Sequence, residues 1–205
     1  MNEILTYPDP VLAKVSRPIT EEEIKSGMIE GLSLNTILDD MMVALATSKG
    51  VGLAAPQIGF SIRLFMLDLR DGTLPRVFIN PKLERFGDKA IGDEGCLSLP
   101  GLFIRVKRSL GCTVTAQAPD GKAFTLKMEG LSARACQHEN DHLDGMLAIN
   151  RLSTTPPSVR RKLEVMERTY GEWQKHLAPK KPSSLPQGTG GVVDKPLPQV
   201  FGHKE

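Results

Sequence analysis

The chain has 205 residues, 40% of them hydrophobic, and a mass of 22.4 kDa, which is enough to bury the core of one domain. Its net charge of +2 is too small to indicate a specific nucleic acid partner, and no apolar run approaches the ~18 residues of a membrane span. Three cysteines are an odd number, which argues against a disulfide framework and for a reducing compartment. Because the first residues also lack the pattern of a signal peptide, we expect a cytoplasmic protein, or an organellar one if a transit peptide has been removed.

The N-terminal quarter of the chain predicts a turn followed by a helix. Residues 3–15 contain Pro8 and Pro10, which indicate an extended or turn segment. Residues 32–48 place apolar side chains at helical spacing, so we expect a helix there. The adjacent methionines at 41 and 42 are expected to pack in the core rather than bind a ligand.

A glycine-rich stretch, GVGLAAPQIG at residues 50–59, allows the backbone to pass very close to another group. It lacks the lysine and Ser/Thr of a phosphate-binding Walker motif and the glycine spacing of a dinucleotide site. A plain tight turn would explain its glycines. Such a turn would not explain Gln57, a polar residue in an otherwise apolar run.

Short segments with strand-like patterns follow, separated by turn signals at Asp71-Gly72, Asn80-Pro81 and Asp120-Gly121. They are residues 62–69, 76–83, 110–118 and 123–128. Strands followed by helices predict an α+β domain with an antiparallel or mixed sheet. Between them, a turn at residues 93–101 holds Cys96. A lone cysteine there is usually an ordinary buried thiol, and we expect Cys112 and Cys136 to be core cysteines of this kind.

The pattern His-Glu-x-x-His at residues 138–142 lies in a run, 131–147, that reads as a helix up to Gly145. Residues four apart differ by about 40° around a helix, so His138 and His142 point the same way and can bind one metal ion. Glu139 lies about 100° from His138, beside the ligands, where a carboxylate can accept a proton from water. A chance match on a solvated helix is the alternative.

The C-terminal part predicts a second amphipathic helix and then a tail. Pro156-Pro157 begins the helix, which runs to His176 with one apolar face and one basic face. From residue 178 the composition changes to proline, glycine, serine and lysine, which indicates a flexible tail. We therefore expect one catalytic domain at 1–177 and a Pro/Gly/Lys-rich flexible tail at 178–205.

Two imidazoles leave a tetrahedral metal ion in need of a third protein ligand. His176, His203 and acidic residues of the second predicted helix lie downstream, and the upstream turn offers Cys96. With these candidates in view, the sequence resembles the peptide deformylases. Three motifs carry the resemblance, in the family's order: residues 50–57, residues 94–98 and residues 137–143. With the opening Tyr-Pro-Asp-Pro-Val-Leu, it covers roughly residues 3–175.

The resemblance implies an α+β fold around a central metal-binding helix, with a C-terminal helix. It also implies a substrate, the N-formyl-methionyl end of a new polypeptide, and the products formate and a free amine. The implied metal ligands are Cys96, His138 and His142. The implied ion is divalent, typically Fe2+, with Zn2+, Ni2+ or Co2+ able to replace it. Thiolate and imidazole donors also suit zinc.

The remaining implied roles concern proton transfer and substrate binding. Glu139 is expected to take a proton from water and hand it to the leaving nitrogen. The side-chain amide of Gln57 and the backbone N–H of Leu97 are expected to stabilise the oxyanion. The peptide is expected to lie alongside Gly50, Val51 and Gly52, with its methionine side chain near Glu94, Leu131 and Ala135.

Two positions depart from the pattern of many family members, namely Phe103, where an arginine is common, and Arg134, where some members have an apolar residue. The rival hypotheses are a general zinc peptidase, the same fold acting on another N-formyl or amide substrate, and a ribosome- or RNA-binding module. That last function would use the basic face of the second predicted helix. We favour a solvated polar face there, although some deformylases dock on ribosomes through a C-terminal helix.

Overall fold

A computed structural model describes residues 3–48, 50–68 and 76–177, so the predicted tail at 178–205 lies outside the described residues. The architecture is α+β, as predicted. The helices are α1 (Glu21–Ser26), α2 (Leu34–Ser48), α3 (Gly130–Leu143) and α4 (Pro157–Leu177). The strands are β1 (Met28–Ile29), β2 (Leu32–Ser33), β3 (Gly52–Ala54), β4 (Leu64–Leu67), β5 (Arg76–Gly95), β6 (Phe103–Gln117) and β7 (Ala123–Glu129).

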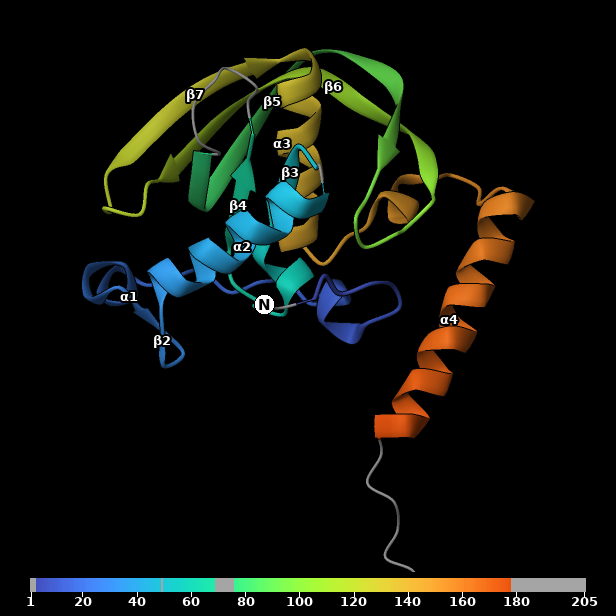
Figure 1. The fold of residues 1–205 in the computed structure, drawn as a ribbon. Coiled ribbons are helices and arrows are strands. Elements are labelled where there is room, and N and C mark those ends of the chain that lie inside the picture. Colours follow the sequence, from blue (N-terminus) through green and yellow to red (C-terminus); the bar gives the residue numbers. More distant parts are fainter. Residues whose placement is uncertain (1–2, 49, 69–75, 178–205) are drawn as a thin grey trace, which may run out of the picture.

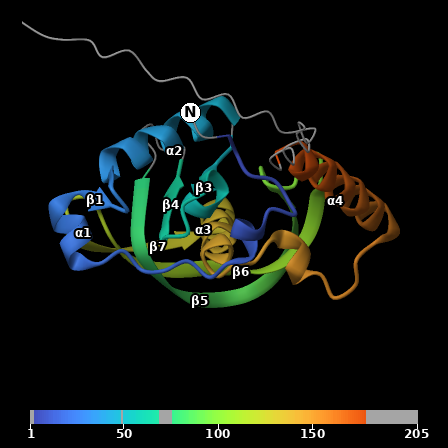
Figure 2. The same ribbon diagram turned by 90° about the horizontal axis from the view of Figure 1, so that it is seen from below.

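One antiparallel sheet of five strands organises the molecule, in the order β3-β4-β5-β6-β7. A second sheet consists only of β1 and β2. The long strands β5 and β6 curve around α3, as the view from below in Figure 2 shows. In Figure 1, α3 stands against this sheet and α4 runs along one side of the molecule. Because β3 is an edge strand, one side of it remains available for pairing with another extended chain.

Two of the predicted strands are much longer than expected. The segment predicted to end at residue 83 continues to Gly95, and the one predicted to begin at 110 starts at Phe103. Their added halves pair with each other from Lys89↔Ser109 to Gly95↔Phe103. Charged residues and glycines occupy the added half of β5, so it lacks the apolar alternation by which a strand is recognised. The added part of β6 does alternate exposed with buried residues.

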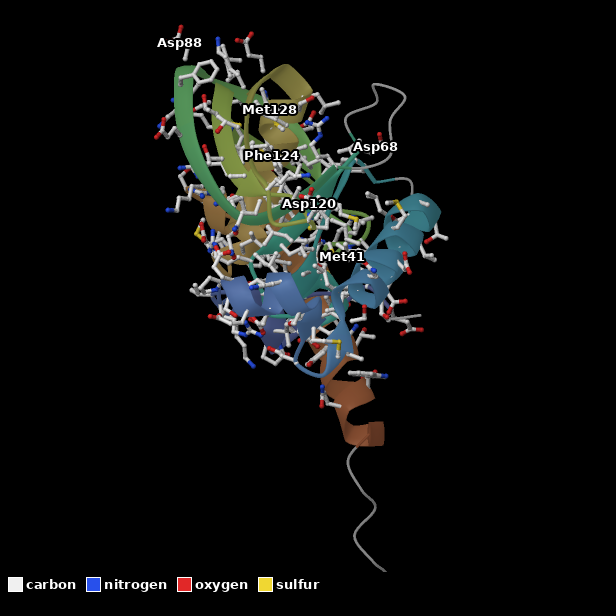
Figure 3. All side chains as sticks on the ribbon, turned by 90° about the vertical axis from the view of Figure 1, so that its left-hand side faces the viewer. Met41, Asp68, Asp88, Asp120, Phe124 and Met128 are labelled. Carbon is white, nitrogen blue, oxygen red and sulfur yellow. The ribbon has the colours of Figure 1, made fainter. Side chains whose placement is uncertain are left out.

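The core includes hydrophobic clusters on both faces of strands β3 and β4. One cluster joins α2 to β3 and β4 and contains Met41, which is fully buried as expected and is labelled in Figure 3. A second cluster packs α3 into the curve of the sheet. It includes Met128 of β7, also labelled in Figure 3, and the two buried cysteines Cys112 and Cys136. The expectation that these two are core cysteines is confirmed.

Helix α4 packs through the apolar stripe that the sequence predicted. Val159 is buried, Leu163 and Met166 pack against the same cluster, and Arg160 and Arg161 are exposed on the other face. Tyr170 donates a hydrogen bond to Asp9 of the N-terminal segment. Within the described residues, no helix is both long and apolar enough to cross a membrane.

Candidate active site

Helix α3 carries five of the predicted site residues, namely Leu131, Ala135, His138, Glu139 and His142. It begins at Gly130, whose φ of +61° allows the chain to turn from β7 into the helix, and Asp144 is its C-cap residue. His138, Glu139 and His142 are all buried, with exposed fractions of 8%, 4% and 1%. A polar helix face buried inside a curved sheet is costly unless its groups have partners or ligands. The polar residues on this face are therefore expected to bind a ligand or take part in a reaction rather than to fill the core.

The turn between β5 and β6 supplies Cys96. The Leu99 N–H donates to the Cys96 carbonyl at 2.9 Å and closes the turn, while Leu99 itself anchors it in the core. Ser98 is also fully buried, and its carbonyl accepts a hydrogen bond from the Tyr7 N–H. These contacts hold the half-buried Cys96 thiol over the histidines of α3.

The donor atoms of Cys96, His138 and His142 all lie within 4.8 Å of one another. Cys96 Sγ is 3.4 Å from His142 Nε2. A tetrahedral ion with ordinary bond lengths to sulfur and nitrogen holds those two atoms about 3.5 Å apart. The spacing therefore fits a metal ion bound by one thiolate and two imidazoles.

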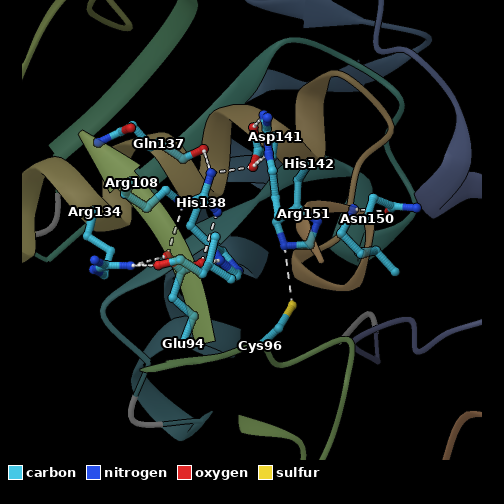
Figure 4. A network of polar contacts seen from close by, with 12 residues as sticks. Glu94, Cys96, Arg108, Arg134, Gln137, His138, Asp141, His142, Asn150 and Arg151 are labelled. Carbon is cyan, nitrogen blue, oxygen red and sulfur yellow. Dashed lines mark hydrogen bonds and ion pairs between the residues drawn. The ribbon is translucent and has the colours of Figure 1, made fainter. Parts of the chain in front are cut away.

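The orientation of His138 is set by Glu94. Glu94 Oε2 lies 2.9 Å from His138 Nδ1, which leaves Nε2 to face the thiolate and a metal. Arg108 donates to both carboxylate oxygens of Glu94 at 2.9 Å, and Arg134 forms a second arginine ion pair with Glu94 at 2.8 Å. Figure 4 shows the side chains of Arg108, Arg134 and His138 converging on this carboxylate. Burial alone would raise the pKa of Glu94, but the hydrogen bonds from Arg108 and His138 hold it well below its usual value.

The buried ion pairs extend along α3 to its C-terminal end. Arg108 also pairs with Asp141, whose carboxylate accepts hydrogen bonds from Arg151. Arg108 and Asp141 are 4% and 1% exposed, so each charge depends on its partners. This network fixes the helix against β6 on the side where the histidines project.

The surroundings shift the pKa values of the two histidines in opposite directions. Burial lowers the pKa of His138, but hydrogen bonds with Cys96 and Glu94 outweigh it and raise that pKa to about 10. Burial and the nearby His138 charge lower the pKa of His142 well below its ordinary value, so His142 is neutral, the form that binds metals.

Glu139 lies against the backbone of β3. A Cβ built on Gly52 would be 2.4 Å from Glu139 Oε1, so this glycine is what permits the approach. Glu139 Oε2 is buried and has no hydrogen-bond partner among the described residues. Burial raises the pKa of Glu139 to about 7, which suits a group that both accepts and returns a proton near neutral pH.

Gln57 is held in place by both ends of its amide. Its Oε1 accepts from the Ala54 N–H at 2.9 Å, and its Nε2 donates to Ser98 Oγ at 3.1 Å. The same Nε2 lies 3.9 Å from Cys96 Sγ, so it reaches the metal site. Leu97, the other predicted oxyanion donor, follows Cys96 in the turn and is half-buried.

A cavity of about 540 Å³ opens in front of these residues. All predicted site residues line it except His142, which is buried. The predicted residues that line it are Gly50, Val51, Gly52, Gln57, Glu94, Cys96, Leu97, Leu131, Ala135, His138 and Glu139. Phe103 and Arg134 also contribute, and Phe103 is 77% exposed at the cavity mouth.

The polypeptide deformylase family model matches residues 1–157 of this chain. The chain belongs to the polypeptide deformylase family. It is similar to the peptide deformylase of Acidobacterium capsulatum, with 42% identity over 176 residues that cover 83% of this chain and 97% of the relative. The peptide deformylase of Azotobacter vinelandii is 39% identical over 171 residues, which are 82% of this chain and 97% of the relative.

Solved deformylases share the fold as well. The structure of Arabidopsis thaliana peptide deformylase 1B in complex with an inhibitor has a TM-score of 0.74 and 33% identity, covering 84% of this chain and 94% of that one. The Thermotoga maritima peptide deformylase has a TM-score of 0.67 and 36% identity, covering 75% of this chain and 99% of that one. The chain is therefore an enzyme of a metal-dependent deformylase family, with a Cys/His/His cluster able to hold the ion.

Sequence reasoning about this deformylase missed the supporting ion pairs. Arg108, Asp141 and Arg151 were not expected at the site, and Glu94 was expected only beside the substrate. One signal was present in the sequence. Ile104, Val106 and Arg108 occupy alternate positions of β6 and share its buried face. An arginine that alternates with buried apolar residues indicates that an acidic partner is buried beside it.

Proposed function

We propose that this chain removes the formyl group from N-formyl-methionyl nascent polypeptides and releases formate. The observation that carries the proposal is the juxtaposition of Glu139 with the Cys96, His138 and His142 cluster beside one cavity, which Glu139, Cys96 and His138 line. A protein of this family needs a base beside a metal ion and room for a peptide terminus. The proposed base, the donor atoms that could hold a metal ion and the cavity support the proposal together.

Cys96, His138 and His142 are the proposed ligands of one divalent ion, which when bound supplies Lewis acidity to the formyl carbonyl and to water. We propose Fe2+ as the ion in the cell, with Zn2+, Ni2+ or Co2+ able to substitute. A thiolate with two imidazoles accommodates each of these metals. Glu94 orients His138 through its Nδ1 and thereby supports the cluster.

Glu139 is the proposed acid–base group. Its carboxylate accepts a proton as water adds to the formyl carbon, and it returns that proton to the nitrogen as the C–N bond breaks. Protonation is needed because an amide nitrogen is a poor leaving group. The products are formate and the free amine. The unpartnered Oε2 and the raised pKa of Glu139 both support this role.

Gln57 and Leu97 are the proposed donors to the developing oxyanion. Ser98 and the Ala54 N–H fix the Gln57 amide, so it needs little rearrangement when charge develops. Leu97 would contribute its backbone N–H from the turn that follows Cys96. Both residues line the cavity next to the thiol.

The peptide is proposed to bind as an additional strand. β3 is a sheet edge, and Gly50, Val51 and Gly52 line the cavity along it. The methionine side chain would then enter the part of the cavity lined by Leu131 and Ala135 of α3, with Glu94 behind them.

The test is to supply the anaerobically iron-loaded chain with formyl-Met-Ala-Ser and identify all products. We expect formate and intact Met-Ala-Ser. Cleavage between methionine and alanine would favour the zinc peptidase hypothesis. If a metal-loaded chain released neither product, a different amide substrate would be favoured, and the exposed Phe103 would be the first position to examine.

A transient ribosome contact is proposed for α4 in addition to catalysis. Arg160, Arg161 and Arg168 are exposed on the face opposite its apolar stripe. Contacts between arginines and phosphates weaken steeply with salt. Co-sedimentation with ribosomes should therefore fall as salt is raised, and salt-independent binding would contradict this contact.

We also propose that residues 1–177 form a single catalytic domain and that the protein is cytoplasmic or organellar. Three free cysteines suit a reducing compartment. Limited proteolysis that leaves an active fragment ending near residue 177 would support the proposed domain, whereas loss of activity on that cleavage would contradict it.

A further inference from the structure

One wall of the cavity is formed by a charged side chain, Arg134. Arg134 precedes His138 by four residues, so both project from the same face of α3. Its Nη1 donates to Glu94 Oε1 at 2.8 Å and to the Val106 carbonyl at 2.9 Å, and its Nη2 donates to the Ala90 carbonyl at 3.0 Å. These bonds tie α3 to both long strands and fix the guanidinium in the wall, where Figure 4 shows it beside Glu94.

A glycine makes room for this arrangement. A Cβ built on Gly92 would lie 2.9 Å from both Cζ and Nη2 of Arg134 and 3.2 Å from its Nε. Nearly equal distances to three atoms of the group place Gly92 over the plane of the guanidinium rather than at its edge. Gly92 does not have a positive φ, so its backbone conformation does not itself require glycine. Glycine is needed there because a side chain at position 92 would collide with Arg134.

Arg134 retains donors after these contacts. A guanidinium carries five N–H groups, and three are used by Glu94, Val106 and Ala90. Within the described ranges, its Nε–H and its second Nη2 proton have no hydrogen-bond acceptor. The side chain is 17% exposed and shares the cavity wall with Leu131 and Ala135. The pocket proposed for the methionine side chain thus combines apolar side chains with the remaining N–H donors of Arg134, whose charge is paired with Glu94.

We propose that Arg134, positioned by Gly92, is a specificity-determining residue that makes this pocket select methionine over an unbranched aliphatic side chain of the same length. The inference rests on the proposed deformylase function. The thioether sulfur of methionine is polarisable and accepts weak hydrogen bonds, so it is attracted to a cationic donor. Norleucine, which has a methylene in place of the sulfur, offers no acceptor and leaves the donor unpaired.

The experiment compares kcat/KM for formyl-Met-Ala-Ser and formyl-norleucyl-Ala-Ser in four forms of the metal-loaded enzyme. These are the parent, Arg134→Met, Gly92→Ala and the double variant. We expect the parent to prefer methionine roughly threefold to tenfold, the range of one weak polar contact. Each single variant should lose most of that preference. The double variant should lose no more, because both changes act through the same guanidinium.

The ratio of the two substrates separates selectivity from support of the fold. If Arg134 only braced α3 and Glu94, its variants would slow both peptides equally and leave the ratio unchanged, which would overturn the proposal. A parent ratio near one, or a change in Arg134→Met without a change in Gly92→Ala, would also overturn it. Arg105→Met, the same substitution at an exposed position of β6, is the matched control and should keep the parent ratio. Metal content and melting temperature are measured for every variant.

The outcomes also distinguish this inference from the function beneath it. Formate release from both peptides at equal rates would contradict the selectivity while leaving the deformylase function intact. Release of formate from neither peptide by the metal-loaded parent would refute the proposed function, and the inference with it.

Discussion

Substitution of Gly52 by alanine tests how closely β3 approaches the proposed base. The added Cβ would lie 2.4 Å from Glu139 Oε1 and 2.8 Å from its Cδ and Cγ, whereas ordinary contact begins at 3.4 Å. The carboxylate must therefore retreat by about 1 Å, and a displacement of that size costs about 100-fold in rate. We expect kcat/KM for formate release to fall by about that factor. Metal content should stay at the parent value, because no ligand is touched.

Three measurements sharpen this prediction. Overpacking should lower the free energy of unfolding by about 1–3 kcal/mol. Glu139→Asp shortens the acid, so the Gly52→Ala and Glu139→Asp double variant should lose less activity than the two single losses combined. Gly171→Ala, where a Cβ meets nothing within 4 Å, is the control and should keep full activity. Near-parental activity in Gly52→Ala would refute the reasoning.

Three further outcomes are expected. Cys96→Ala should abolish stoichiometric metal binding measured by elemental analysis, while Cys112→Ala, which alters a buried core thiol, should retain the ion. In the metal-free chain the raised pKa of Glu139 destabilises the fold as pH rises from 4.5 to about 7. Glu139→Gln should therefore raise stability by roughly 3 kcal/mol at pH 8 and by little at pH 4, and equal effects in denaturant titrations at both pH values would contradict this. Arg108→Met should lower the free energy of unfolding by about 3–5 kcal/mol, because it removes the cation that Glu94 and Asp141 share. A loss under about 1 kcal/mol would argue against a buried network.

Features that depend on local periodicity could be predicted from the sequence. The helical spacing of His138 and His142 and the placement of Glu139 beside the ligands follow from the geometry of one helix. The apolar stripe of α4 and the core position of Met41 follow from the same periodicity. The contribution of Cys96 came from the resemblance to a family rather than from spacing, because a turn more than forty residues away is placed only by the tertiary fold.

Features that depend on which face of a strand is buried could not be predicted in this way. The second half of β5 is polar, and its length, like that of the first half of β6, became clear only from their mutual pairing. Arg108 is useful only because β6 turns it inward to meet Glu94, and Arg134 only because Gly92 leaves room for it. These residues are the part of the site that the motifs do not contain.

The most direct test of the account compares the parent enzyme with Glu139→Gln at equal, measured metal content. Both are loaded anaerobically with Fe2+, and formate release from formyl-Met-Ala-Ser is followed at pH 7.5. The account predicts release by the parent and a loss of at least about 100-fold in the variant although its metal stays bound, because general acid–base catalysis typically contributes that much or more. Parental rates in a metal-replete Glu139→Gln variant would contradict the proposed role of Glu139 and the mechanism built on it.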